Sequence, residues 1–333
     1  MILLRNQQIT YASWWTILKD NPLSSPFQTP DYYELCNRLK GISAEVFALE
    51  DKNNLRALCV VTLLKESGIQ GYFSRRAIIY GGPVLKDSDN DMFNLFIKSI
   101  EEHVTPNVIY IEIRNFFDYS QLNSIYKLAD WELMPYLNIK LSLKGKSLED
   151  TLSLMKYNRK REIKLSIAEG AIFREANDIS EVRNLYDILR DLYINKVKLP
   201  LPNWDFFLSF FNESICKVFV VLHNNKIIGG SFCYFLEKKS IYTMYYCGIR
   251  NYHKKIFPTH LSILAAIEFG IRENLENIDF MGAGLQGKEY GVREYKREFG
   301  GELYEYGRFR KINNRFLFVL GVVGLKIQKH IKK

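Results

Sequence analysis

The 333-residue sequence lacks several features that would assign it to a common class of protein. No stretch reaches the roughly 18 consecutive apolar residues of a membrane-spanning helix, and its N-terminus has too short an apolar stretch for a secretory signal peptide. The five cysteines are scattered without a C-x-x-C motif, and the five histidines show no metal-ligand spacing. We therefore expect a cytoplasmic protein with reduced thiols, no metal and no cofactor.

The charge and composition indicate what is present instead. Lys and Arg number 46 against 37 Asp and Glu, a net charge of +9, which favours a phosphate-bearing or otherwise anionic partner, although a basic surface can also serve only solubility. The length suits two domains, and 47% hydrophobic residues can build a core in each.

One pattern occurs twice in the chain, at an offset of about 170 residues. The segments 45–61 and 217–233 each read as a Val-Phe strand, a turn containing Asn-Asn and a second apolar strand. Each is followed by another β segment, a helical stretch (91–103 and 258–274) and a short strand beginning at Asn107 or Asn277. The repeat predicts a duplicated α/β domain with mixed sheets, largely antiparallel.

A glycine-rich run, Gly282-Ala-Gly284-Leu-Gln-Gly287, spells the dinucleotide-binding motif G-x-G-x-x-G. Too few residues follow it to complete a parallel dinucleotide-binding domain, which normally needs roughly a hundred more. We interpret the run as a strand end where bare backbone can approach a substrate. The alternative is a tight turn from strand to helix that binds nothing.

A basic helix is predicted between the two repeats. Ser147-Leu-Glu-Asp150 offers a capping box for a helix that runs to Gly170. Cations crowd its middle, among them Arg159, Arg161 and Lys164. Such a stripe is either a solvated helix face or a contact for phosphates.

Six further segments form a recognisable set: YNRKREIKLSIAEG, YYCGIRN, IDFMGAG and YGVREYKREFGGEL in the second half, with FQTPDYY and YGGPVL in the first. Together they resemble the Fem-type aminoacyltransferases of peptidoglycan-bridge synthesis, a family of the GNAT acyltransferase superfamily. The resemblance implies two tandem GNAT-like domains, at 1–145 and 146–310, with the active site in the second and a basic, apolar tail at 311–333.

The resemblance also implies a reaction and the residues for it. An acceptor amine attacks the activated carbonyl of an aminoacyl-tRNA, so the amine must be positioned and the oxyanion stabilised. Tyr295-Lys296 matches the family's aromatic-Lys pair, so Lys296 would stabilise the oxyanion and Tyr295 would shape the carbonyl pocket. The remaining binding candidates are the three helix cations already named, the strand-end glycines Gly282 and Gly284, and Tyr245, Tyr246, Arg250, Lys254 and Lys255. The general base stays open among Glu289, Glu294, His253 and the substrate itself.

Two departures from the family pattern bear on the substrates. The loop Arg250-Asn-Tyr-His-Lys-Lys255 lacks the glycines of the superfamily's pyrophosphate-binding loop, which puts acetyl-CoA in doubt. Cys36 falls near the place where bridge-forming enzymes carry a lysine for the nucleotide-sugar pyrophosphate, so the acceptor need not be the usual peptidoglycan precursor.

Three hypotheses follow for the function. The first is aminoacyl transfer to an amine of a cell-wall or surface-glycan precursor, and the second is N-acyl transfer from an acyl thioester in polysaccharide synthesis. The third is a basic module that binds RNA or a membrane without catalysis.

The C-terminal tail carries a prediction of its own. It has ten uncharged residues, 316–325, followed by Lys326, Lys329, His330, Lys332 and Lys333. Such a tail either lies on an anionic membrane or packs back on the protein.

Overall fold

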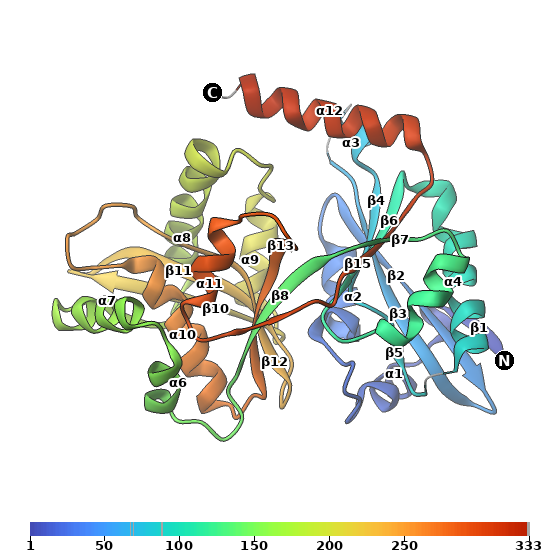
Figure 1. Cartoon of the computed structure of the whole chain (residues 1–333), viewed down its shortest axis with the longest axis horizontal. Helices are drawn as coiled ribbons and strands as arrows, with labels where there is room; N and C mark the ends of the chain where they lie inside the picture. The colour runs from blue at the N-terminus through green and yellow to red at the C-terminus, as the bar shows by residue number, and fades with distance from the viewer. Residues whose placement is uncertain (67, 69, 88, 332–333) are drawn as a thin grey trace. The chain divides into compact units, whose positions relative to one another are not determined.

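The chain folds into two compact units, seen in Figure 1 of this computed structural model, which describes residues 1–66, 68, 70–87 and 89–331. The first unit comprises Met1–Tyr136 together with the segment from Glu305 onward, and the second comprises Leu137–Tyr304. Lys332 and Lys333, part of the predicted basic tail, lie outside the described residues. Within the described part of the chain, no helix has the length and apolar character to cross a membrane.

The first unit is built around a mixed sheet in the order β1-β2-β3-β4-β6-β15-β7, with β5 paired to β3. Its elements are β1 (Ile2–Arg5), α1 (Tyr11–Leu18), α2 (Pro30–Arg38), β2 (Ile42–Asp51), β3 (Asn54–Leu64), α3 (Gln70–Ser74), β4 (Arg76–Gly81), β5 (Val84–Leu85), α4 (Asn90–Val104), β6 (Tyr110–Asn115), α5 (Asn123–Leu128), β7 (Glu132–Met134), β15 (Arg308–Ile312) and α12 (Arg315–Ile331).

The second unit has a sheet in the order β14-β8-β13-β12-β11-β10-β9. Its elements are β8 (Tyr136–Ser142), α6 (Leu148–Leu154), α7 (Tyr157–Ala168), β9 (Ile172–Glu175), α8 (Ile179–Leu192), α9 (Trp204–Asn212), β10 (Cys216–His223), β11 (Lys226–Phe235), β12 (Ser240–Gly248), α10 (Pro258–Arg272), β13 (Asn277–Leu285), α11 (Gly291–Arg297) and β14 (Glu302–Tyr304). The expected fold class, two units with mixed and largely antiparallel sheets, is confirmed.

The repeated hairpins are present at the predicted places. β2–β3 turns at Lys52-Asn53 and β10–β11 turns at Asn224-Asn225, and all four residues have φ between 48° and 60°. Two central residues with positive φ make the turn whose twist matches a β-hairpin, and Asn tolerates that conformation. Each hairpin also carries a register irregularity beside its turn, at Leu49/Glu50 and at Val221/Leu222.

Each sheet takes one strand from the other half of the sequence. β15 pairs with β6 and β7 in the first sheet, whereas β8 lies between β13 and β14 in the second. The division of the chain therefore falls at 136/137 and 304/305, and it differs from the expected bounds of 1–145, 146–310 and 311–333. The difference arises because long-range strand pairing, not the end of a repeat, decides which unit a strand joins.

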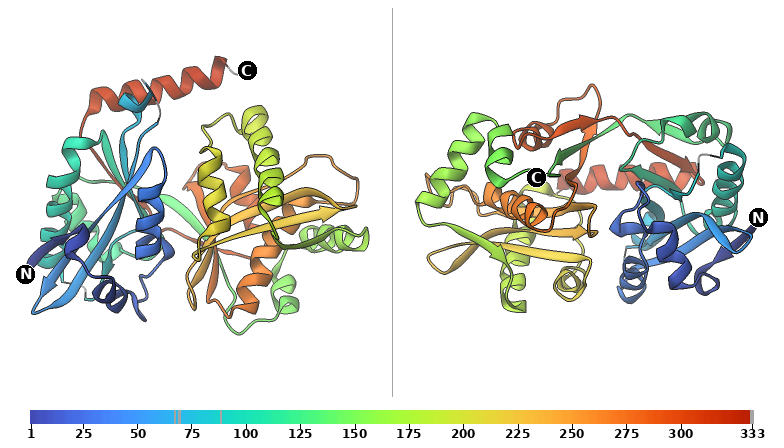
Figure 2. Two further views of the ribbon diagram at one scale, coloured as in Figure 1. Left: turned by 180° about the vertical axis from the view of Figure 1, so that it is seen from behind. Right: turned by 90° about the horizontal axis from the view of Figure 1, so that it is seen from below.

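Helices cover both faces of each sheet. In the second unit α8 and α9 pack on one face, and α10 packs on the other (Figure 2). The face toward α10 supplies a core that includes Val221, Ile241 and Phe280. In the first unit the corresponding core packs α4 and α5 against Phe47, Ile79 and neighbouring side chains.

The predicted basic helix is two helices. Its capping box at Ser147 and Asp150 is confirmed, but α6 ends at Leu154 and α7 begins at Tyr157, because Met155 is extended and buried. The amide of Lys156 donates to the carbonyl of Glu298 at 3.0 Å, a bond that ties the break to the segment after α11.

Candidate functional site

The candidate site lies where the parallel strands β12 and β13 stop pairing. They are in register only from Ser240↔Asn277 to Tyr242↔Asp279, although β12 continues to Gly248 and β13 to Leu285. A register irregularity opposite Phe232/Cys233 leaves Met244 as a bulge just past that point. Bulges commonly end pairing and redirect side chains beside functional sites.

Beyond the last pair, the backbone of β13 adopts conformations that are rare in a strand. Met281 has a φ of 60°, and Gly284 has a φ of 80°. The amide of Met281 donates to the carboxylate of Asp279 at 2.7 Å, which supports the local turn. A Cβ on Gly284 would lie 2.8 Å from the ring of Tyr290, so the glycine permits that ring to pack on the strand. Strain of this kind persists where the surroundings enforce it and gathers at functional sites.

Two cations of α11 hold this strand end in place. The ammonium of Lys296, only 5% exposed, donates to the carbonyl of Gly282 at 2.9 Å. The guanidinium of Arg293 donates to the carbonyls of Ala283 at 2.8 Å, Lys288 at 2.9 Å and Leu285. The glycine-rich run is therefore a strand end clamped by the following helix, as expected. It does not form a dinucleotide site, because Gly282 and Gly284 lie within β13 and the next helix begins only at Gly291.

An aromatic wall stands beside Lys296. The rings of Tyr246 and Tyr295 stack with centroids 6.1 Å apart and planes inclined by 16°. Burial raises the pKa of both phenols above the ordinary value. Tyr245 instead contacts Phe206 and Phe207 of α9, so the adjacent tyrosines occupy opposite faces of β12 and cannot form one wall together.

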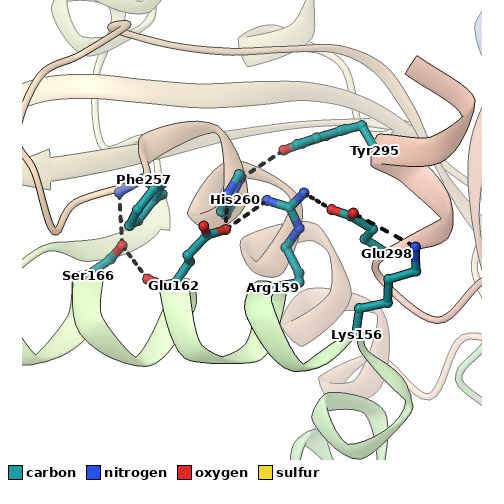
Figure 3. A network of polar contacts seen from close by, with 8 residues as sticks. All are labelled: Lys156, Arg159, Glu162, Ser166, Phe257, His260, Tyr295 and Glu298. Atoms are coloured by element: carbon teal, nitrogen blue, oxygen red, sulfur yellow. Dashed lines mark hydrogen bonds and ion pairs between the residues drawn. The ribbon is translucent and has the colours of Figure 1, made fainter. Parts of the chain in front are cut away.

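Arg159, one of the predicted phosphate ligands, points inward from α7 (Figure 3). It is 4% exposed, and its guanidinium contacts Glu298 at 2.5 Å, Glu162 at 3.6 Å and the Nε2 of His260. The guanidinium also lies over the ring of Tyr295, 4.5 Å from its centroid. Because two carboxylates balance its charge, Arg159 is built into the support of Tyr295.

His260 links this ionic cluster to the aromatic wall. Its Nε2 lies 3.0 Å from Glu162 and its Nδ1 lies 3.2 Å from the hydroxyl of Tyr295. Burial, with the nearby charge of Arg159, lowers the pKa of His260 to about 3. A neutral imidazole has one donor and one acceptor nitrogen, so it can fix the orientation of the Tyr295 hydroxyl.

The other predicted phosphate ligands are exposed, and several share one surface. Arg161 and Lys164 lie on the outer side of α7, and Arg250, Lys254 and Lys255 lie in the loop between β12 and α10. That loop is attached to α7, because Lys255 pairs with Glu169 at 2.7 Å and the amide of Phe257 donates to the hydroxyl of Ser166 at 2.9 Å. The structure thus brings the basic helix and the basic loop together.

Sequence reasoning missed a buried acid next to the strand end. Asp279 is fully buried, its Oδ2 has no hydrogen-bond partner among the described residues, and Lys140 of β8 lies 3.9 Å away. Burial raises the pKa of Asp279 and lowers the pKa of Lys140. Of the general-base candidates, Glu289, Glu294 and His253 are exposed. Glu162, Glu298 and His260 are the acid–base groups that lie around Tyr295.

No known family model matches the chain, and no curated protein matches it in sequence. Solved structures do match. FemX superposes with a TM-score of 0.74 at 13% identity, over 96% of this chain and 99% of its own. The chain has the Fem-type tandem GNAT fold.

Two further structures have the same fold. L-PGS from Bacillus licheniformis matches with a TM-score of 0.58 at 12% identity, over 95% of this chain and 96% of its own. A tandem GNAT protein of the clavulanic acid biosynthesis pathway matches with a TM-score of 0.56 at 8% identity, over 94% and 99%. The Fem-type fold predicted from the sequence is thus confirmed.

Proposed function

We propose that the protein is an acyltransferase that forms an amide on an amine of a cell-wall or surface-glycan precursor, with an aminoacyl-tRNA as donor. One observation carries this proposal. Where β12 and β13 stop pairing, the buried ammonium of Lys296 donates to the carbonyl of Gly282, beside the stacked rings of Tyr246 and Tyr295. The neighbouring FemX, L-PGS and tandem GNAT structures support the class of reaction.

The reaction has two requirements that the site must meet. The acceptor amine must lie close to the carbonyl, and the negative charge that develops on the carbonyl oxygen must be stabilised. Lys296 supplies a positive charge whose position is fixed before the substrate arrives, because its side chain is buried and its ammonium is bonded to the carbonyl of Gly282. Tyr295, held by His260 and Arg159, shapes the carbonyl pocket. The acceptor amine attacks the ester carbonyl directly and the tRNA hydroxyl leaves with a proton, so no covalent enzyme intermediate is needed.

The loop between β12 and α10 favours tRNA over acyl-CoA. A pyrophosphate needs free backbone amides at such a loop. Here the amides of Lys255, Ile256 and Phe257 bond to His253 Nδ1, the His253 carbonyl and Ser166, and Pro258 has no amide hydrogen. The exposed cations of α7 and the loop instead suit the phosphates of a longer nucleic acid.

Replacement of Lys296 tests the proposal. Lys296→Met should lower kcat by about a hundredfold or more, because one preorganised charge is lost at the oxyanion. Lys288→Met, which removes an exposed lysine from the preceding turn, is the matched control and should leave kcat unchanged. Near-full turnover by a folded Lys296→Met protein would contradict the role, and an effect on KM alone would make Lys296 a binding residue.

The donor is tested separately by the salt dependence of binding. If aminoacyl-tRNA binds, the double variant Arg161→Ala/Lys164→Ala should weaken affinity and flatten its salt slope, because fewer counterions are released. Lys98→Ala/Lys127→Ala, two exposed lysines of the first unit, is the control. Tight, saturable binding of an acyl thioester without measurable tRNA affinity would favour N-acyl transfer, the second candidate, for which the clavulanic acid pathway protein is the structural precedent. Failure to transfer from either donor would favour a non-catalytic binding module.

A further inference from the structure

The first unit carries an exposed apolar surface formed by α3 and α12. We define the α3–α12 surface by six side chains: Tyr72, Phe73, Phe316, Val319, Leu320 and Val323. They are 39–72% exposed, the least being Phe73 and the most Phe316. The two helices contact one another, and a Cβ at Gly321 of α12 would lie 3.0 Å from the carbonyl oxygen of Phe73 (Figure 1).

The described part of α12 is apolar on both sides, which is unusual for a surface helix. Its inner side includes Phe318, which packs edge-to-face on Tyr110 with centroids 5.4 Å apart. Its outer side presents residues 316, 319, 320 and 323, one helical stripe without a polar side chain. A helix at a protein–water boundary normally keeps that stripe polar, and a contiguous apolar patch marks an interaction site.

A pocket that holds two cations borders this surface. It has a volume of about 270 Å³, and its lining combines Lys65 and Arg75 with the polar Ser43 and Asn107 and with apolar side chains (Ile42, Leu63, Leu64 and Val108). Arg75 directly follows α3, its guanidinium lies 5.1 Å from the centroid of the Tyr72 ring, and its buried Nε has no hydrogen-bond partner among the described residues.

The start of α12 is anchored next to the same pocket. The amides of Asn313 and Asn314 donate to the carbonyl of Ile109 at 2.9 and 3.1 Å, and the Asn313 side chain donates to the carbonyl of Val108, a lining residue, at 3.3 Å. Glu66, which directly follows the lining residue Lys65, pairs with Arg76 at 3.7 Å. The apolar surface therefore continues into a cationic pocket.

We propose that the α3–α12 surface docks on an anionic lipid membrane, with the pocket receiving a phosphate of a lipid headgroup. A helix of this length lies in the interface with its apolar stripe buried, and aromatic side chains such as Tyr72 and Phe73 suit that depth. Charge selects lipid over a second copy of the chain. The described cations beside this surface are Arg315, at the start of α12, and Lys65 and Arg75 of the pocket, so two such faces would repel one another. This inference does not depend on the transfer reaction.

Vesicle co-sedimentation of the full chain tests the proposal. The protein should sediment with vesicles of phosphatidylcholine and phosphatidylglycerol, and much less with phosphatidylcholine alone. Val319→Asp/Leu320→Asp should lower the partition by roughly tenfold or more, because it places two carboxylates in the buried stripe. Leu95→Asp, at a 46% exposed leucine of α4, is the matched control and should bind like the unmodified chain.

A second pair of variants tests the pocket. Lys65→Ala/Arg75→Ala should weaken binding to the anionic vesicles by roughly tenfold, while the weak binding to phosphatidylcholine alone stays the same. Circular dichroism of each variant checks its fold. Equal recovery of all proteins on the anionic vesicles would overturn the proposal. A dimer in sedimentation velocity that Val319→Asp/Leu320→Asp dissociates, without vesicle binding, would overturn it in favour of self-association.

Discussion

The two repeats share the order hairpin, strand, helix and strand, apart from α3 and β5 in the first, but they differ where their parallel strands meet. In the first unit β4 and β6 stay paired over all six positions, from Arg76↔Tyr110 to Gly81↔Asn115. In the second unit β12 and β13 pair over three positions and then part. Paired strands satisfy one another's backbone groups, whereas strand ends that have parted can turn theirs toward a substrate. This difference supports the proposal that the second unit carries the reaction.

Each unit also buries an ionic cluster, and the two are built for different tasks. In the first unit the carboxylate of Glu112, 2% exposed, accepts hydrogen bonds from Arg114, Arg308 and Arg310. The cluster therefore links β15 to β6 through side chains. In the second unit the central charge is the cation Arg159, and the cluster continues through His260 to the hydroxyl of Tyr295. The first cluster joins strands, and the second supports a side chain of the candidate site.

The largest effect on stability is expected at Glu112. Burial alone would raise its pKa, but the three arginines outweigh burial and hold the pKa at about 2. Glu112→Gln leaves buried guanidinium groups without their counter-charge and should lower the free energy of unfolding by about 3 kcal/mol. Glu45→Gln, which breaks the more exposed pair with Arg5, should cost less than about 1 kcal/mol. Similar losses for both variants in urea denaturation would show that the cluster does not hold β15.

The next effect concerns the parted strands of the second unit. Gly284→Ala should displace the Tyr290 ring and lower kcat by roughly tenfold, because small displacements at a reacting site are costly. Gly287→Ala is the matched control, since Gly287 also has a positive φ, 71°, but has open space around it. Both changes should lower stability by about 1 kcal/mol through backbone strain. Equal kcat values for the two variants would separate the strand end from catalysis.

The Arg159–His260 cluster of the second unit should make the stability of the protein depend on pH. His260 stays neutral in the folded protein down to a pKa of about 3, whereas an unfolded histidine protonates near pH 6.5. The unfolded state therefore binds the extra proton first, so stability should fall as the pH drops below about 6.5 toward 3, by about 1 kcal/mol per pH unit. His260→Gln should remove this part of the acid sensitivity in denaturation curves measured between pH 7 and 5. Identical slopes for both proteins would mean that His260 is not held neutral.

The features predicted from the sequence are those that neighbouring residues determine. Local sequence patterns determine the hairpin turns at Asn53 and Asn225. They also determine α4 and α10, the equivalent helices of the two repeats, so all four features appear where expected. The exchange of β8 and β15 could not be predicted, because it depends on strand pairing between distant halves of the chain.

The interior position of Arg159 depends in the same way on a distant residue. Arg159 looks like any cation of its stripe until Glu298, 139 residues later, folds beside it. One local signal was available, since Glu162 is the acid of an otherwise basic helix and lies at i+3 from Arg159. His260 offered no such signal, and its role emerges only from packing.

The smallest expected effect on stability concerns the hairpin turns, a feature that the two repeats share. Asn53 and Asn225 hold the second position of equivalent turns, each with a φ of 60°, and glycine adopts that conformation at lower cost than asparagine. Asn53→Gly and Asn225→Gly should each change the free energy of unfolding by a few tenths of a kcal/mol, in the same direction and by the same amount. Thermal unfolding of both variants against the unmodified chain measures this. Changes of opposite sign would mean that the two hairpins, though alike in register, are held by different contacts, and that the repeats have diverged in their support as well as at their parallel strands.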